Sequence, residues 1–240
     1  MTRYDAKDTK ICNGWSKLLS TAVTVVLSLT VIPSWTFQNS VQEADGGGSD
    51  RLNKHACINL FNGSWDSHTR TCVTFDDDGY TLSSPRFTIP EGATLIVASG
   101  FTLTVNDGAS LNNEGTILNN FVIVNDGTIN NSGTLDNAEG IIHNNGKINN
   151  DGTIDSFNFV LNYSGGVINN NGTINIGNDV YIGNLGSINN YETINIGIGG
   201  GISNFGTVSN YGTINNSGEI QNCGIVNNSG SIIGNVIGPC

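Results

Sequence analysis

Three consecutive segments of the chain repeat one sequence at a spacing of twenty residues. They begin at Gly146, Gly166 and Gly186, and their sequences are GKINNDGTIDS, GVINNNGTINI and GSINNYETINI. A unit this short cannot bury its own apolar side chains, so the copies have to stack on one another, as repeats do in a solenoid. The repeat therefore predicts a protein whose function depends on an extended, regular surface, and it disfavours a fold organised around an active-site pocket.

Apolar residues recur every six positions within each copy. Each hexad has the form N-x-G-T-I-N, whose centre alternates polar and apolar residues as a half-buried strand does. The hexads predict an all-β parallel β-helix (solenoid) over residues 87–240, with three short strands per coil of about 19–20 residues and about seven or eight coils. No segment beyond Ser40 has helical periodicity. The apolar series are Ile129, Leu135 and Ile141; Ile148, Ile154 and Val160; Ile168, Ile174 and Val180; and Val208, Ile214 and Ile220.

Stacking places equivalent residues of successive coils in columns about 4.8 Å apart. An inward aliphatic column is expected from Leu135, Ile154, Ile174, Ile194 and Ile214. An asparagine ladder is expected at a corner, because each side-chain amide can donate to one neighbour and accept from the other. The Asn-x-Gly corners suggest left-handed backbone turns. The ladder would contain Asn131, Asn150, Asn170, Asn190 and Asn210.

The first forty residues are of a different kind. Four basic residues precede an uncharged run from Leu18 to Ile32. A membrane span usually needs about 20 apolar residues, and this run is shorter and is diluted by serine and threonine. Residues 1–40 are therefore expected to be a signal peptide, with an uncleaved N-terminal membrane anchor as the alternative. Residues 41–54 contain EADGGGSD and are expected to be a flexible linker.

Cysteine usage agrees with export. Beyond the apolar run, the remaining cysteines form two local pairs, Cys57 with Cys72 and Cys223 with Cys240. Locally paired cysteines in an exported chain suggest disulfides, and both pairs lie where a solenoid needs caps for its open core and unpaired strand edges. We expect a small disulfide-closed N-terminal cap at residues 55–86 and a C-terminal disulfide cap. The alternative is four reduced, buried thiols.

One part of the sequence resembles a known class of proteins. The segment CINLFNGSWDSHTRTC leads into FTIPEGATLIVASGFTLTVNDGASLNNEGTI and then into NDGTINNSGTL repeats. Over residues 55–240 the chain is similar to secreted or cell-surface parallel β-helix proteins of archaea and bacteria, adhesin-like in type. The resemblance implies a right-handed helix and a surface role, and its motifs specify architecture far better than function.

Catalytic groups are scarce. Polysaccharide lyases and hydrolases with this fold need carboxylates clustered with a basic residue, and Asp136 and Asp155 do share a column at a separation that suits a retaining glycosidase. The solenoid contains a single histidine, His143, and Lys147 is the sole lysine or arginine after Arg86. Isolated basic residues on exposed coils are typical of solvated surface, so we expect no catalytic residue and no enzyme. A secreted carbohydrate-active enzyme of the lyase or hydrolase type is the alternative.

Calcium is the metal that the acidic residues would suit, because oxygen ligands recur in Asn106-Asp107-Gly108, Asn125-Asp126-Gly127, Asn150-Asp151-Gly152 and the run Asp76-Asp77-Asp78. The nonapeptide of calcium-binding β-rolls is absent, however, and Asp-Gly is an ordinary turn sequence. We therefore expect turns at these positions, and no metal or cofactor.

A column of threonines is expected on one outward face. Regular threonine arrays can order water, and ice-binding solenoids usually present two such columns, whereas the partner column here is Asp136, Asp155, Asn175, Asn195 and Asn215. Threonine is also simply a good strand former. An ice-associating protein is thus the second alternative. The threonine column consists of Thr134, Thr153, Thr173, Thr193 and Thr213.

The formal net charge is −11. An acidic chain lacks the basic footprint expected of proteins that bind nucleic acid or anionic lipid. We expect a non-enzymatic, secreted or cell-surface structural or adhesion module that binds glycans or other cell-surface components and self-associates through exposed edges, with membrane contact through the N-terminal segment alone. An exported chain would also expose N-glycosylation sequons. The candidates are Asn62, Asn130, Asn162, Asn171, Asn215 and Asn227.

Overall fold

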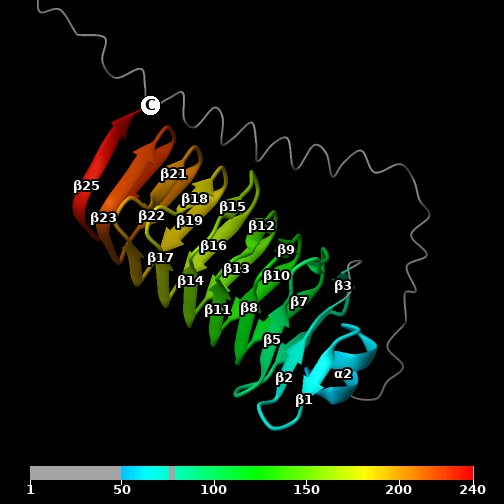
Figure 1. The fold of residues 1–240 in the computed structure, drawn as a ribbon. Coiled ribbons are helices and arrows are strands. Elements are labelled where there is room, and N and C mark those ends of the chain that lie inside the picture. The colour runs from blue at the N-terminus through cyan, green and yellow to red at the C-terminus, as the bar shows by residue number, and fades with distance from the viewer. Residues whose placement is uncertain (1–49, 76–78, 240) are drawn as a thin grey trace, which may run out of the picture. The chain divides into compact units, whose positions relative to one another are not determined.

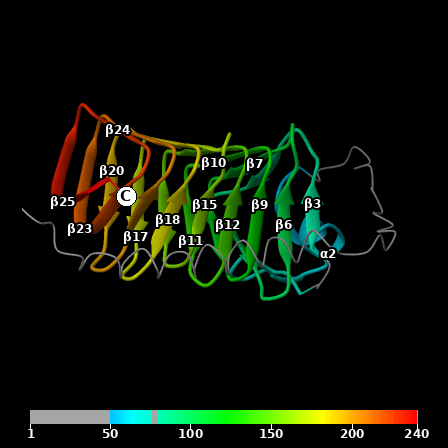
Figure 2. The same cartoon turned by 90° about the horizontal axis from the view of Figure 1, so that it is seen from above.

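The computed structural model describes residues 50–75 and 79–239, and it confirms an all-β parallel solenoid with three strands per coil (Figure 1). Figure 2 shows the coils following one another in chain order from β3 to β25. The expected number of coils is confirmed, because one face is a single sheet of eight parallel strands. This first face consists of β4 (Phe87–Ile89), β7 (Ser110–Asn113), β10 (Thr128–Asn131), β13 (Lys147–Asn150), β16 (Val167–Asn170), β19 (Ser187–Asn190), β22 (Thr207–Asn210) and β24 (Ile225–Asn228).

The other two faces belong to one sheet of 17 strands, because β23 (Thr213–Asn222) and β25 (Ser231–Pro239) run through both of them. The second face consists of β2 (Thr71–Val73), β5 (Thr94–Val97), β8 (Thr116–Asn119), β11 (Thr134–Asn137), β14 (Thr153–Ser156), β17 (Thr173–Ile176) and β20 (Thr193–Ile196). The third face consists of β3 (Tyr80–Leu82), β6 (Thr102–Val105), β9 (Val122–Asn125), β12 (Ile141–Asn144), β15 (Val160–Asn162), β18 (Tyr181–Asn184) and β21 (Gly201–Asn204).

Successive coils are aligned so that equivalent hexad positions meet. Ile154, for example, pairs with Ile174 in the next coil. The predicted aliphatic column is confirmed, since each member exposes at most 5% of its surface. Burying these side chains contributes about 25 cal/mol per Å² of apolar surface and holds the coils together. The column consists of Leu135, Ile154, Ile174, Ile194 and Ile214.

The inward column of the third face differs from the prediction. Ile142 and Ile182 are buried there, with 1% and 2% exposure, whereas the predicted Ile141 and Val180 are half-buried. The corners that lead into β12 and β18 contain extra residues, which shift the register of the strand that follows. Coil length therefore varies: it is 18 residues between Leu111 and Ile129, 22 between Val160 and Ile182, and 24 between Phe87 and Leu111.

Glycine at the corners is required by close backbone approach. A Cβ atom at Gly152 or Gly172 would collide with the carbonyl oxygen of Gly133 or Gly152, the glycine one coil earlier. Neither Gly152 nor Gly172 is among the residues with a positive φ. The prediction that these Asn-x-Gly corners use left-handed backbone is therefore wrong. The coils lie about 4.8 Å apart, and at these two glycines that spacing brings the backbone of the preceding coil into the place of a Cβ atom.

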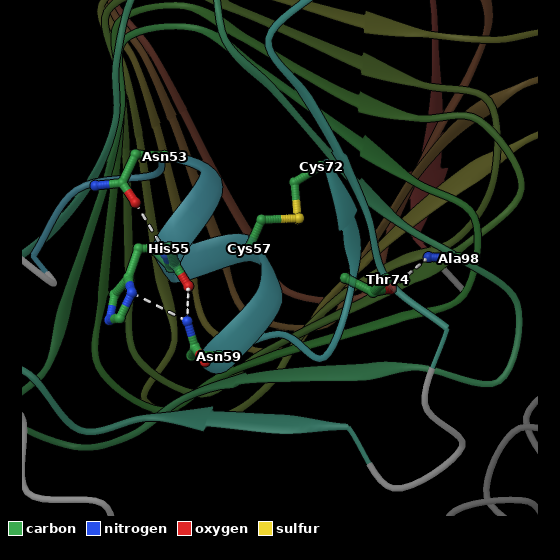
Figure 3. Close-up of a disulfide and its surroundings, with 8 residues drawn as sticks. Asn53, His55, Cys57, Asn59, Cys72, Thr74 and Ala98 are labelled. Carbon is green, nitrogen blue, oxygen red and sulfur yellow. Dashed lines mark hydrogen bonds between the residues drawn. A yellow bond between two sulfur atoms is a disulfide. The ribbon is translucent and has the colours of Figure 1, made fainter. Parts of the chain in front are cut away.

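A small cap covers the N-terminal end of the coil stack. It contains one short helix, α2 (Lys54–Asn59), which the hexad pattern did not predict. Asn53 caps this helix, because its side-chain oxygen accepts a hydrogen bond from the Ala56 N–H at 2.9 Å (Figure 3). The predicted Cys57–Cys72 disulfide is confirmed and joins α2 to β2. For this pair, the alternative of reduced thiols is wrong.

The boundaries of the cap differ from the predicted ones. The folded chain begins before residue 54, because Leu52 is 2% exposed and its N–H donates to the Thr88 carbonyl oxygen at 2.8 Å. The solenoid also begins before Phe87, since β2 and β3 already pair in parallel with β5 and β6. Only β1 (Ser64–Asp66) pairs antiparallel, with β2, among the described strands. The predicted linker therefore ends earlier, and the predicted cap includes parts of the first coil.

Several sequence predictions concern residues outside the described ones. They are the signal peptide or anchor at 1–40, most of the linker, Asp76 to Asp78, and Cys240. Cys223 is disulfide-bonded, as expected for the C-terminal pair, but its predicted partner Cys240 lies outside the described residues. Across residues 50–75 and 79–239, no helix combines the length and the apolarity that crossing a membrane requires.

Candidate binding faces of the solenoid

Two asparagine ladders inside the corners fix the spacing of the coils. The predicted ladder between the first and second faces is confirmed, and it extends beyond the predicted members in both directions. Each Nδ2 donates to the Oδ1 of the next coil at 2.7–2.8 Å. Buried amides are costly unless they are hydrogen-bonded, and the ladder satisfies them coil by coil. Its members are Asn113, Asn131, Asn150, Asn170, Asn190, Asn210 and Asn228.

A second ladder lies between the third and first faces, and sequence inspection missed it. Its bonds are also 2.7–2.8 Å long. Each of the two ladders starts with a buried carbonyl oxygen that has no partner, on Asn113 and on Asn125, because the coil below offers Ile89 or Val105 instead of a donor. The members are Asn125, Asn144, Asn162, Asn184, Asn204 and Asn222.

The first face carries a further column of amides on its outer surface. Their Nδ2 atoms donate toward the preceding coil at 2.8–2.9 Å, opposite in direction to the buried ladders. An amide has two N–H groups and two carbonyl lone pairs, so each half-exposed member keeps hydrogen-bonding capacity for solvent or a ligand. The outer column consists of Asn112, Asn130, Asn149, Asn169 and Asn189.

The second face carries the threonine column. The register places the five predicted threonines in one line, and three more precede them, so the column is longer than predicted. All of them are half-buried. The column consists of Thr71, Thr94, Thr116, Thr134, Thr153, Thr173, Thr193 and Thr213. Next to it on the same strands runs the predicted partner column, which begins with Asp136 and Asp155 and continues as asparagine.

The two aspartates of this partner column interrupt its hydrogen bonds. Asp155 accepts a bond from Asn175 Nδ2 at 2.7 Å, but Oδ1 of Asp136 is buried without a partner. The neighbour of Asp136 in the preceding coil is Leu118, which offers no donor. Burial, together with the charge of Asp155, raises the pKa of Asp136 above its ordinary value. This pair is therefore a local source of instability.

We expect Asp155→Asn to raise the free energy of unfolding by about 1 kcal/mol at neutral pH. The new amide would donate to Asp136 while its carbonyl continued to accept from Asn175, and the repulsion between two carboxylates would disappear. Urea denaturation of both proteins measures the difference. Asp151→Asn is the matched control, because Asp151 also accepts an amide bond, from Asn171, but its counterpart one coil earlier is Ser132. An equal gain in both variants would contradict the explanation.

The same pair predicts a pH dependence. Because the pKa of Asp136 is raised in the folded state, the folded protein binds this proton more tightly than the unfolded chain does. The Asp136 carboxylate therefore lowers stability above its raised pKa, and this cost disappears as the pH falls toward the ordinary value of 3.8. We expect the difference in free energy of unfolding between Asp155→Asn and the native protein to shrink as the pH falls from the raised pKa of Asp136 toward 3.8.

The four residues that a carbohydrate-active site would have to combine do not come together. Asp136 and Asp155 lie on the second face, His143 on the third and Lys147 on the first. His143 is instead engaged locally, with its Nδ1 2.9 Å from the Tyr163 hydroxyl and the two rings stacked. Burial lowers the pKa of His143. The hypothesis of an active site built from this group of four therefore loses its geometric basis.

The acidic residues at the corners form hydrogen bonds between neighbouring coils. The carboxylates of Asp126 and Asp151 accept amide hydrogen bonds from Asn145 and Asn171 in the next coil, at 2.8 and 2.9 Å. Within residues 50–75 and 79–239, no group of three or more histidine, cysteine or acidic side chains lies together as a metal site would require.

The glycosylation candidates differ in accessibility. Asn62, Asn171, Asn215 and Asn227 are exposed, and Asn130 is half-buried within the outer amide column. Asn162 is fully buried, and its amide belongs to the second ladder. A glycan at Asn162 is therefore incompatible with the folded chain, and this candidate has to be removed.

Comparison of the chain with protein-family models, curated proteins and solved structures finds no match. What the structure establishes is the architecture: a repeat-rich parallel β-solenoid with a disulfide in its N-terminal region. Its candidate binding surfaces are two flat faces lined with amide and hydroxyl columns.

Proposed function

We propose that this chain is a non-enzymatic, secreted or cell-surface structural or adhesion module that presents its stiff polar faces to glycans. The observation that carries the proposal is the outer amide column of the first face, beside the threonine column of the second. Both repeat from coil to coil at a fixed spacing, and neither has a register shift between β4 and β22 or between β2 and β20.

Glycans suit these columns chemically. A sugar chain offers hydroxyl groups that both donate and accept, and amides and hydroxyls can match either role. A face that is already held in place by backbone and amide ladders loses little conformational entropy on binding. The shortage of basic residues fits an uncharged ligand better than nucleic acid or another polyanion.

Export is part of the proposal. The Cys57–Cys72 disulfide hints at an oxidising environment, where such bonds persist. The uncharged run that follows basic residues near the N-terminus and the resemblance to surface β-helix proteins point the same way. The four exposed sequons would be accessible there.

A glycan array and pull-down on cell-wall polysaccharides test the function. We expect the native protein to bind, and the double variant Asn149→Ala, Asn169→Ala to bind about tenfold more weakly, because it removes two neighbouring amides worth about 0.5–1.5 kcal/mol each. Thr102→Ala with Thr104→Ala, at the two half-buried outward positions of β6 on the third face, is the control and should leave binding unchanged. Failure to bind any glycan on the array or in the pull-down would contradict the proposal.

Ice association is a second candidate, favoured by the length of the threonine column on one flat face. An ice-binding protein would show thermal hysteresis or reshape growing ice crystals, and Thr173→Tyr in the middle of the column would abolish the effect. Unaltered ice growth in the presence of the native protein would remove this candidate.

A further inference from the structure

The last coils carry exposed apolar side chains at both edges of the first face. Leu185 and Phe205 directly precede the turns into β19 and β22, and Tyr191 and Tyr211 directly follow these two strands. Their exposed fractions are 44%, 47%, 48% and 55%. We call the pairs Leu185–Phe205 and Tyr191–Tyr211 the two rails. Burying such side chains on a partner would release apolar surface from water.

The tyrosine rail is an ordered feature. The rings of Tyr191 and Tyr211, one coil apart, are stacked with centroids 5.2 Å apart and planes 8° from parallel. Stacking restricts their motion before any ligand arrives, which lowers the entropic cost of binding. Tyrosine also combines apolar ring surface with a hydroxyl that can hydrogen-bond, a combination common in binding surfaces.

The surface between the rails is polar and flat. The outward positions of β19 and β22 are Ser187, Asn189 and Thr207, which are half-buried, and Ser209, which is 7% exposed. The register between the two strands is unbroken. The strand and its corners separate the rails by six residues, or about 20 Å of extended chain. That width exceeds one sugar chain lying along the solenoid.

The rails are confined to this end of the face. In the preceding coils the column on the tyrosine side contains Ser132, Asp151 and Asn171. The other column contains Asp126, Asn145 and then Tyr163, which is half-buried and stacked on His143. Exposed phenylalanines also occur at the corner between the second and third faces, but the loops there differ in length and form no regular column.

The charge around the rails limits the ligand. After Arg86, Lys147 is the sole lysine or arginine of the chain, and it lies two coils away from Ser187 in the same outward column. Glu192, which is exposed, directly follows Tyr191. An anionic polysaccharide would meet a carboxylate here without a cation to neutralise its charge.

Building on the proposed glycan binding, we infer that the C-terminal part of the first face docks onto the flat surface of a packed, uncharged polysaccharide. The two rails contact the C–H surfaces of neighbouring sugar chains, and the side chains of Ser187, Asn189 and Thr207 between them bind hydroxyl groups. The preferred ligand class is an insoluble neutral polysaccharide, with isolated oligosaccharides and acidic polymers bound more weakly.

The experiment measures depletion of the full chain from solution by microcrystalline cellulose and by chitin, beside soluble oligosaccharides of the same sugars and an acidic polysaccharide. Two variants each remove one rail: Tyr191→Asn with Tyr211→Asn, and Leu185→Asn with Phe205→Asn. Asparagine already occupies both columns, at Asn171 and Asn145, so the fold tolerates it. Each variant is expected to bind the insoluble polymer at least tenfold more weakly. The control is the double variant Ser132→Asn, Asn171→Ser, which swaps two polar residues of the tyrosine column. Its binding to the insoluble polymer should stay within twofold of the native protein.

The outcomes separate this inference from the proposed function. Equal binding of native protein and rail variants, or a preference for soluble or acidic glycans, would overturn the inference and leave glycan binding intact. Failure to bind any insoluble, soluble or array glycan would overturn both. Sedimentation that shows a dimer of the native protein and a monomer of the rail variants would identify the rails as a contact between two copies, and would also overturn the inference.

Discussion

Replacing Asn170 with alanine is expected to lower the free energy of unfolding by about 3–5 kcal/mol. Asn170 is fully buried. It accepts a hydrogen bond from Asn150, and it donates to Asn190 Oδ1 at 2.7 Å and to the Thr193 carbonyl oxygen at 2.9 Å. Alanine would leave several of these groups without a partner in a site that water does not reach, and each such group costs about 1–3 kcal/mol.

Asn169→Ala is the matched control for this prediction, because the adjacent residue lies on the outer side of the same strand. Asn169 also bonds to two amides, donating to Asn149 and accepting from Asn189, both at 2.9 Å. It is half-buried, so water can replace the lost bonds, and we expect a loss below about 1 kcal/mol. Urea denaturation of both variants measures the difference. Similar losses of unfolding free energy in the two variants would mean that burial does not determine how much the asparagine ladder contributes to stability.

The hexad pattern was sufficient to predict the architecture. Isoleucine at the centre of N-x-G-T-I-N alternates with polar neighbours, and a repeat of fixed length leaves only stacking as a way to bury it. The column from Leu135 to Ile214 and the ladder from Asn131 to Asn210 follow directly, because both lie in parts of the coil whose length does not change. Local spacing therefore determined the long-range contacts.

The errors arise where the spacing changes. Two extra residues before β18 move Ile182 into the core in place of Val180, and the same variable corners hid the second ladder, whose members are 18–22 residues apart. The helix α2 contains six residues, which is too short for helical periodicity to be visible in the sequence. Its position depends on the Cys57–Cys72 disulfide and on packing, which local pattern cannot supply.

The candidate faces were predicted in part. The threonines were found because one threonine directly precedes the inward leucine or isoleucine on successive strands of the second face. The Asp136–Asp155 pair was found because it shares these strands. The outer amide column was missed, although the sequence contains the signal for it. Consecutive residues of a strand point to opposite sides, so the first asparagine of each Asn-Asn pair points outward when the second points inward. The rails were missed because the residue type at these two corner positions changes from coil to coil, and because the exposure of the side chains depends on the fold.

Gly172→Ala is expected to lower the free energy of unfolding by about 3 kcal/mol, at the upper end of the range for overpacking. The added Cβ would collide with the carbonyl oxygen of Gly152 and with the backbone of Asp151 in the preceding coil. Both obstacles are backbone, so no side-chain rotation can relieve them, and the coils would have to separate locally. For a chain of this size, the midpoint temperature of thermal unfolding (Tm) should fall by about 6–12 °C.

The next coil supplies the control, because it carries Glu192 at the position equivalent to Gly172. The chain accommodates a Cβ there, and the bond from the Thr193 N–H to the Gly172 carbonyl oxygen measures 3.1 Å, against 2.9 Å for the equivalent bond from Thr173 to Gly152. Glu192→Ala keeps the Cβ and should change stability by less than about 0.5 kcal/mol. If Gly172→Ala were equally harmless, the corner could relax as it does at Glu192, and close backbone approach would not explain why glycine recurs at this corner.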